Sequence, residues 1–255
     1  MESLPRADWV EISGLVDSLR VIKSAAEQTC MREAARVSDA AMLAAVDTIR
    51  VGATERDIAA ECHRAMIQAG GTFPGFGPFI RPASRIQEEH TSWGEGFLSD
   101  GDTVFLELSG CVRRYHAPMG RLVFVGKTPA AAREMATICR DAFAAVVEAL
   151  RPGVPAGQVY AAWQGVVDAA GLAGYRRHHC GYLVGIGFPP SWTGGNKVTG
   201  LRPDGEWPVQ TGMTFHVLSW LLGTARGDYF LSNTVLLGER GAEVLTRTPT
   251  DILVR

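Results

Sequence analysis

The sequence predicts an α+β protein in which two similar halves form one domain, with a curved antiparallel sheet and helices on its outer face. Two observations predict this fold. Residues 32–71 and 133–172 align without a gap, and each reads as a helix, a turn and a second helix. Each helical pair is followed by runs rich in β-branched and aromatic residues, which are typical of strands. Helices on one face of a sheet leave the inner face free for a cleft.

The two helical pairs have the same residues at the turn and at the end of the second helix. The turn between the helices is R-x-G in both copies, Arg50–Gly52 in the first and Arg151–Gly153 in the second. The second helix of each pair ends on a glycine, Gly70 or Gly171, and glycine suits the left-handed position that closes a helix. The duplication therefore predicts helix, turn, helix in each half.

The duplication extends into the strands. The first pair is followed by "DTVFLELSG" and "RLVFVG", and the second by "YLVGIGF", "MTFHVLSWLL" and "NTVLLG". Matching Gly101–Glu107 with Gly212–Leu218 places Glu107 opposite Leu218 across a pseudo-two-fold axis. The segments "GGTFPGFGPFIRP" and "FPPSWTGGNKVTGLRPDGEWP" read as long loops, which in compact domains tend to border binding sites.

Composition excludes several classes of function. The chain has 255 residues, of which 46% are hydrophobic, and this is enough for a substantial core. A net charge of −2 without runs of like charge argues against a nucleic-acid partner. The five cysteines are scattered and never spaced as CxxC, so we expect reduced thiols. The N-terminus "MESLPRADWVEISG" is no signal peptide and no stretch is long enough to span a membrane, so we expect a cytoplasmic protein with no membrane partner.

The first helical half also resembles a known family. The stretch "VIKSAAEQTCMREAARVSDAAMLAAVDTIRVGATERDIAAE" is similar to the opening pattern of the pita-bread family of creatinases, prolidases, aminopeptidases P and methionine aminopeptidases. The resemblance runs from about Leu19 onward. It implies the pita-bread fold, a catalytic domain at residues 19–255, an N-terminal stub at residues 1–18 in place of the N-terminal domain of longer members, and a homodimer.

The resemblance also allows a test for metal. Most pita-bread enzymes hold two metal ions with two aspartates, one histidine and two glutamates. The corresponding positions here are occupied by Glu107, Pro118, Tyr182, Leu218 and Ser232. Proline and leucine offer no side-chain donor, and neutral tyrosine and serine are poor ligands without neighbouring anions. We therefore expect a protein that uses no metal and no other cofactor.

Three further strings resemble the metal-independent branch that contains creatinase and the ectoine hydrolases: "FLELSG…RRYHAPMGR", "GYLVGIGFPPSW" and "GMTFHV". The segment "WTGGNK" departs from that pattern because it lacks the acidic and histidine residues expected there. The resemblance implies hydrolysis of a C–N bond in a small zwitterionic amidine or guanidine compound. Glu107 is then the nucleophile or base, and His90 the acid/base that serves the leaving nitrogen.

Each catalytic candidate has a structural alternative. A buried carboxylate in a strand normally needs a partner, so Glu107 on its own would be read as an ion pair with Arg121 or Arg114. A loop histidine such as His90 is more often solvated than catalytic. The family positions favour catalysis for both residues.

The candidate substrate-binding residues are Tyr115, His116, Tyr182, His216, Trp93 and His179. Tyr115 and His116 lie at a strand-to-strand turn, where a structural role is equally plausible. Tyr182 and His216 either line the pocket that the metal ligands vacated or are hydrogen-bonded within the core. Trp93 is one of several tryptophans that either surround a cation or fill the core. The cluster "RRHHC" at residues 176–180, which contains His179, is either a solvated surface or a site for a substrate carboxylate.

Two other functions stay open. The altered "WTGGNK" segment is compatible with a lyase or cyclase that uses the same pair of residues. The loss of four ligand positions is also compatible with a non-catalytic pita-bread module that binds another protein.

Overall fold

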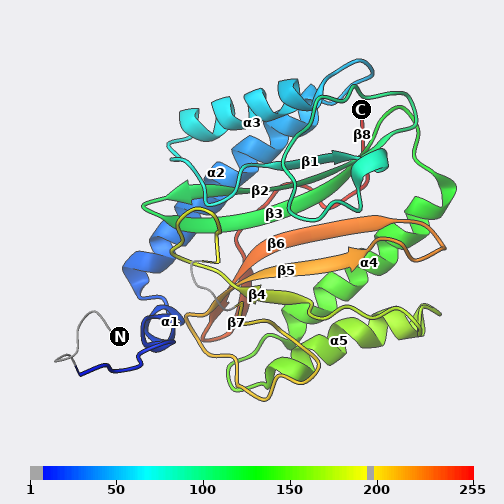
Figure 1. Ribbon diagram of the computed structural model, residues 1–255. Coiled ribbons are helices and arrows are strands. Elements are labelled where there is room, and N and C mark those ends of the chain that lie inside the picture. The colour runs from blue at the N-terminus through cyan, green and yellow to red at the C-terminus, as the bar shows by residue number, and fades with distance from the viewer. Residues whose placement is uncertain (1–7, 194–197) are drawn as a thin grey trace.

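The computed structural model describes residues 8–193 and 198–255 and has an α+β fold (Figure 1). The helices are α1 (Leu15–Arg20), α2 (Ala25–Thr48), α3 (Glu55–Gln68), α4 (Ala130–Ala149) and α5 (Ala156–Ala169), with a short 3-10 turn η1 (Ala83–Arg85). The strands are β1 (Phe79–Pro82), β2 (Thr103–Val112), β3 (Tyr115–Phe124), β4 (Gly181–Leu183), β5 (Thr214–Leu221), β6 (Tyr229–Gly238), β7 (Gly241–Val244) and β8 (Leu253–Val254). No helix among these described residues combines the length and apolar character needed to cross a membrane.

The strands form one sheet whose two halves meet at β3 and β6. The order is β1-β2-β3-β6-β5-β4, with β7 paired to β6 and β8 paired to β3. Pairing along this order is antiparallel throughout, and β8 runs parallel to β3. The β3–β6 ladder consists of two register pairs, Gly120 with Ser232 and Arg121 with Leu231. The backbone ladder between the two halves is therefore short.

The predicted duplication is confirmed. The end of α2 at residue 48 and the bounds of α3 at 55 and 68 each recur 101 residues later, at 149, 156 and 169, where α4 ends and α5 begins and ends. Gly70 and Gly171 have φ angles of 90° and 79°, the left-handed conformation predicted for a closing glycine. Side-chain capping boxes fix the starts of α2 and α3, at Ser24 with Glu27 and at Thr54 with Asp57.

The helices cover one face of the sheet, the outer face (Figure 1). Helix α2 packs behind β2 and β3, and α3 packs on α2 and β1. In the second half α4 packs behind β5 and β6, and α5 packs on α4. The contact is close at Gly110 of β2, whose backbone N–H donates to Ser38 Oγ of α2 at 2.7 Å. Since successive side chains of a strand alternate between faces, Glu107 lies on the opposite, inner face.

A row of residues crosses the inner face at the level of Glu107. Directly paired residues of antiparallel strands share a face. The register pairs Phe79 with Glu107, Glu107 with Gly120, Gly120 with Ser232 and Ser232 with Leu218. Glu107 and Leu218 are thus equivalent about the Gly120–Ser232 junction, as the internal repeat predicted.

The sequence missed some elements. β1 lies inside a segment predicted to be a loop, because its four residues are flanked by Gly and Pro and gain their ladder from the distant β2. β4 keeps two residues of the predicted run "YLVGIGF", Tyr182 and Leu183. α1, β7 and β8 are two to six residues long, too short to show a periodic pattern.

Candidate active site

Glu107 is buried on the inner face, and none of the described residues donates a hydrogen bond to it. Glu107 is 7% exposed. Within the described chain, no arginine or lysine forms an ion pair with its carboxylate. Burial raises the pKa of the Glu107 carboxyl to about 7, the nearby Arg81 guanidinium opposes this rise, and Glu89 adds to it. The group is thus close to half ionised near neutral pH, which suits a general base.

Neither expected ion-pair partner reaches Glu107. Arg121 pairs with Leu106 across the ladder and therefore lies on the outer face, where its guanidinium donates to backbone carbonyls such as Ser232 O at 2.8 Å. Arg114 lies at the β2–β3 turn, where it donates to Gly187 O and Phe73 O at 3.1 and 2.6 Å. The cation beside Glu107 is Arg81 of β1, which the sequence did not suggest.

A chain of hydrogen bonds runs across the inner face beside Glu107. Trp192 Nε1 donates to the Tyr182 hydroxyl at 2.9 Å, and that hydroxyl lies 2.8 Å from His216 Nδ1. His216 Nε2 lies 2.8 Å from Ser232 Oγ and 3.7 Å from Glu107 Oε1. Burial holds the pKa of His216 well below its usual range, so the ring is neutral and its approach to Glu107 is not an ion pair.

Donor and acceptor counting assigns the protons of this chain. Because Trp192 can only donate, the hydroxyl of Tyr182 accepts from it and has its own proton to donate to His216 Nδ1. His216 then carries its proton on Nε2, where it faces Ser232 Oγ and the Glu107 carboxylate. This assignment gives Trp192 Nε1, the Tyr182 hydroxyl and His216 Nε2 one acceptor each.

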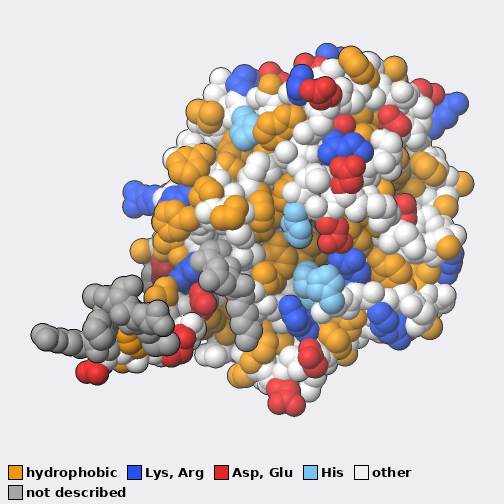
Figure 2. All heavy atoms as spheres, viewed as in Figure 1, with side chains coloured by type: hydrophobic (Ala, Val, Ile, Leu, Met, Phe, Trp, Pro, Cys, Tyr) orange, Lys and Arg blue, Asp and Glu red, His pale blue; other side chains and the backbone are white. Residues whose placement is uncertain are grey.

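His90 lies at the mouth of the same site. It is exposed and has a φ of 58°, and its ring packs on Phe76 and Phe79 at centroid distances of 6.0 and 5.9 Å. Both phenylalanines also contact Trp192, at 4.8 and 5.4 Å. Because Phe79 is directly opposite Glu107, the structure brings His90 and Glu107 to one cleft without direct contact. Figure 2 shows histidine and charged side chains gathered around apolar ones on this face.

Tyr115 and His116 lie further along β3. The Tyr115 hydroxyl donates to Glu27 Oε1 of α2 at 2.8 Å, so this side chain faces the helices and not Glu107. His116 is fully buried on the inner face, and its Nε2 accepts from Gly75 N at 2.9 Å. Burial lowers the pKa of His116 to about 4, which makes it a neutral support for the loop that carries Phe76.

Trp93 and His179 have different surroundings. Trp93 packs edge-on against His63 of α3 at 5.7 Å and belongs to the core beneath the helices, so the structure does not bring it to Glu107. His179 packs against Tyr182 at 5.4 Å and lines the cleft. Burial and the neighbouring cations lower the pKa of His179 to about 3. The departure noted in "WTGGNK" falls largely on residues 194–197, outside the described residues.

The donor set at the five family positions does not fit a two-metal centre. Pro118 and Leu218 offer no side-chain donor, and the hydroxyls of Tyr182 and Ser232 are engaged with His216. Within residues 8–193 and 198–255, no group of three or more His, Cys, Asp or Glu side chains is arranged to hold a metal ion. Glu107 is the one carboxylate of the set.

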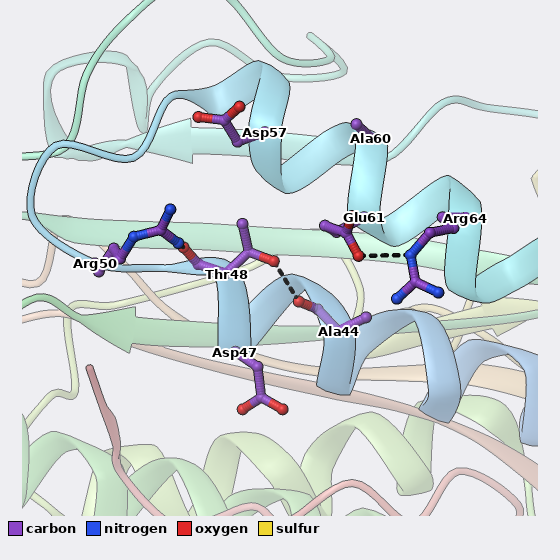
Figure 3. A pocket seen from close by; sticks show the side chains of 8 residues that line it. All are labelled: Ala44, Asp47, Thr48, Arg50, Asp57, Ala60, Glu61 and Arg64. Carbon is purple, nitrogen blue, oxygen red and sulfur yellow. Dashed lines mark hydrogen bonds and ion pairs between the residues drawn. The ribbon is translucent and has the colours of Figure 1, made fainter.

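A hollow of about 600 Å³ lies elsewhere, on the outer surface between α2 and α3 (Figure 3). It is lined by small residues and by charged ones, which include the exposed pair Arg64 and Glu61 at 2.7 Å. Exposed pairs of this kind are ordinary surface features. The chemistry is concentrated at Glu107 and not in this hollow.

Comparisons with known proteins show which family model and which relatives the chain matches. The model of "Metallopeptidase family M24" matches residues 29–239. An uncharacterized hydrolase/peptidase of Sinorhizobium fredii is 28% identical over all of this chain and 64% of its own length. The ectoine hydrolase of Halomonas elongata is 27% identical over all of this chain and 65% of its own length. The Xaa-Pro dipeptidase of Pyrococcus furiosus is 25% identical over 96% of this chain and 69% of its own length.

Solved structures match the fold. A Xaa-Pro dipeptidase from Bacillus anthracis superposes with a TM-score of 0.87 at 23% identity, covering 98% of this chain and 68% of that one. The prolidase from Pyrococcus furiosus gives 0.84 at 25% identity, covering 94% and 69%. The predicted pita-bread architecture is confirmed. The chain spans about two thirds of the length of these relatives.

Proposed function

The chain belongs to metallopeptidase family M24, and we propose that it is a hydrolase of that family which cleaves a C–N bond in a small zwitterionic substrate without a metal ion. One observation carries this proposal. A buried carboxylate, Glu107, is present where the other four ligand positions are occupied by Pro118, Tyr182, Leu218 and Ser232. A carboxylate kept in such surroundings without an ion-pair partner needs a role, and direct action on substrate supplies one.

Glu107 acts on the carbon of the scissile bond. With a pKa raised to about 7 by burial, the ionised carboxylate either attacks that carbon or removes a proton from the attacking water. Its negative charge also complements a cationic amidinium or guanidinium group. His216 Nε2 is hydrogen-bonded to Ser232 Oγ and lies 3.7 Å from Glu107 Oε1, so a neutral ring lies beside the carboxylate.

His90 serves the leaving nitrogen. Its ring lies over Phe76 and Phe79 at the cleft mouth, where a proton can pass between substrate and solvent. Because His90 is exposed and does not touch Glu107, the two groups can act from opposite sides of a bound substrate. This division assigns the nucleophile or base to the strand and the proton donor to the loop.

The substrate class rests on the relatives. Similarity to an ectoine hydrolase favours a cyclic amidine, and similarity to Xaa-Pro dipeptidases favours a dipeptide as the second candidate. Both reactions hydrolyse a C–N bond. A lyase or cyclase acting in the same pocket, or a protein-binding module without catalysis, would make other products or none.

The test is turnover of ectoine, creatine and Xaa-Pro dipeptides by the purified chain, with metal analysis of the same sample. We expect product heavier than substrate by one water, activity that survives chelation, and loss of at least a hundredfold in kcat for Glu107→Gln. Full turnover by Glu107→Gln would refute the assignment. Stoichiometric metal that is required for activity would refute metal independence. A product that is not heavier than the substrate by one water would favour the lyase or cyclase.

A further inference from the structure

Two adjacent arginines, Arg176 and Arg177, have different surroundings. Arg176 is exposed and forms an ion pair with Asp168 of α5 at 2.8 Å. Arg177 is half-buried, and within the described chain its guanidinium forms neither an ion pair nor a hydrogen bond. Its backbone carbonyl accepts from the Tyr160 hydroxyl at 2.7 Å, which fixes the loop at this point.

The Arg177 guanidinium is held in place by an aromatic ring. Its Cζ lies 4.7 Å from the centroid of Trp220, and stacking of this kind orients the planar group without consuming its N–H donors. Trp220 packs on Phe230 and Phe105 at 5.0 and 5.4 Å, and these two rings stack at 4.6 Å. We call Phe105, Trp220 and Phe230 the aromatic floor.

The aromatic floor lies beside Glu107 on the same face. Phe105 precedes Glu107 by two residues on β2, which corresponds to about 6.8 Å along a strand. Trp220 pairs directly with Phe230, two residues beyond the Leu218–Ser232 pair of the central row. One side of the cleft thus presents the Glu107 carboxylate. The other side presents the Arg177 guanidinium, whose N–H donors have no acceptor among the described residues.

Arg81, the cation beside Glu107, already has partners. Arg81 covers Phe105 at 4.1 Å and donates to Glu88 O, and its charge acts mainly on Glu107 and Glu89. Among the residues that the structure describes, no carboxylate forms an ion pair with Arg177. An arginine fork with free donors binds a carboxylate bidentately, at a fixed distance from the floor below it.

We propose that Arg177 is the residue that binds the carboxylate of the substrate, with the aromatic floor between it and Glu107. This assignment rests on the proposed function in placing substrate at the Glu107 cleft. It applies equally to ectoine and to a dipeptide, because both carry a carboxylate. It divides the cluster at residues 176–180 into a surface arginine and a specificity-determining one.

The test measures binding of two matched pairs of ligands to the whole chain by calorimetry: ectoine with its carboxamide, and Ala-Pro with Ala-prolinamide. We expect the wild-type protein to prefer the acid of at least one pair by about tenfold or more. Arg177→Gln should weaken binding of that acid about tenfold, or roughly 1.4 kcal/mol, and leave its amide unchanged. Arg177→Lys should restore part of the preference. Arg176→Gln is the matched control and should keep all of it.

Three outcomes would overturn the proposal: an Arg177→Gln variant that keeps the preference, an Arg176→Gln variant that loses it equally, or a wild-type protein that binds no acid of either pair. A thermal melt of each variant separates loss of binding from loss of folding. The outcome is distinct from that of the proposed function, because binding is measured without turnover. A preference that depends on Arg177 alongside an active Glu107→Gln variant would support the carboxylate site and refute the catalytic assignment.

Discussion

Glu107 has an unfavourable environment that should appear in the stability of the protein. Its pKa rises from 4.5 to about 7 on folding, so between these values the folded state binds more protons than the unfolded state. Stability therefore falls as pH rises through this window. At about 1.4 kcal/mol for each pKa unit, the cost above pH 7 is roughly 3 kcal/mol at most.

We predict that Glu107→Gln makes the protein more stable at pH 8 than the wild type, by about 1–3 kcal/mol, and that this gain disappears near pH 5. Denaturant unfolding at the two pH values checks it. Glu134→Gln is the control, because Glu134 is an exposed carboxylate paired with Arg226 and should show little pH-dependent difference. A gain independent of pH would contradict the raised pKa.

Arg81 should act on the reaction through Glu107. Its positive charge opposes the rise in the pKa of Glu107, so Arg81→Met should move the acid limb of the pH profile of kcat/KM to higher pH. Arg81→Lys, which retains the charge, should keep the limb near its wild-type position. Both variants lose packing on Phe105, so a shift found in both would indicate a structural effect.

At the residue scale, several of the candidate side chains named from the sequence lie together, whereas their neighbours were not predicted. Glu107, Tyr182, His216 and His179 lie in one cleft. Trp93 does not, because a tryptophan in a loop gives no signal of whether it packs on α3 or on the inner face. Arg81 was missed because it is near Glu107 through the pairing of β1 with β2, which no local pattern shows.

At the element scale, Gly120 makes the junction of β3 with β6 possible. A Cβ added there would lie 2.2 Å from Phe230 Cε1 and 2.9 Å from Leu106 O, so a side chain would push the two strands apart. We predict that Gly120→Ala destabilises the protein by about 1–3 kcal/mol or more. Thermal unfolding measures this.

Gly165→Ala is the control for that prediction. Gly165 is exposed in α5 and a Cβ there meets nothing within 4 Å, so the substitution should stabilise the protein by about 0.5–1 kcal/mol. If Gly120→Ala lowers the stability and Gly165→Ala raises it, the loss at Gly120 is due to packing at the junction. Equal effects of the two would contradict the close approach at the junction.

The elements that the sequence predicted are those that recur in both halves or are long enough to show a periodic pattern. The helices α2 to α5 were predictable because the gapless alignment repeats their R-x-G turns and their closing glycines, Gly70 and Gly171. β1 and β8 were not, because two to four residues acquire strand conformation only from the long strand beside them. Local sequence patterns therefore predicted the helices and the long strands but not the edge strand β1, which carries Arg81.

At the scale of the whole molecule, the homodimer stays a prediction. Exposed apolar side chains gather in residues 9–22, where they include Val10 at 77% and Leu19 at 74% exposure. Surfaces of this kind favour association. We expect a dimer by light scattering at micromolar concentration, and association weakened by Leu19→Glu. A monomeric wild type would contradict it.

The two halves and the C-terminal segment should unfold as one unit because of Arg121. Its buried guanidinium donates to Gly120 O and Ser232 O at 2.7 and 2.8 Å, and to Thr248 O and Pro249 O at 2.6 and 2.9 Å. These bonds reinforce a β3–β6 ladder of two register pairs. Removing the charge leaves several buried carbonyls without a donor, each at a cost of about 1–3 kcal/mol, so Arg121→Met should lower stability by about 3–5 kcal/mol.

Hydrogen exchange distinguishes this role from simple packing. In Arg121→Met, we expect the amides of β3 and β6 at the junction to lose protection before those beneath α2 and α4, since the backbone ladder there has two register pairs. Arg140→Met is the control, because its ion pair with Asp251 is exposed and should contribute less than about 1 kcal/mol. If Arg121→Met kept the wild-type unfolding midpoint and protection pattern, the halves would be held together by the core and not by this arginine.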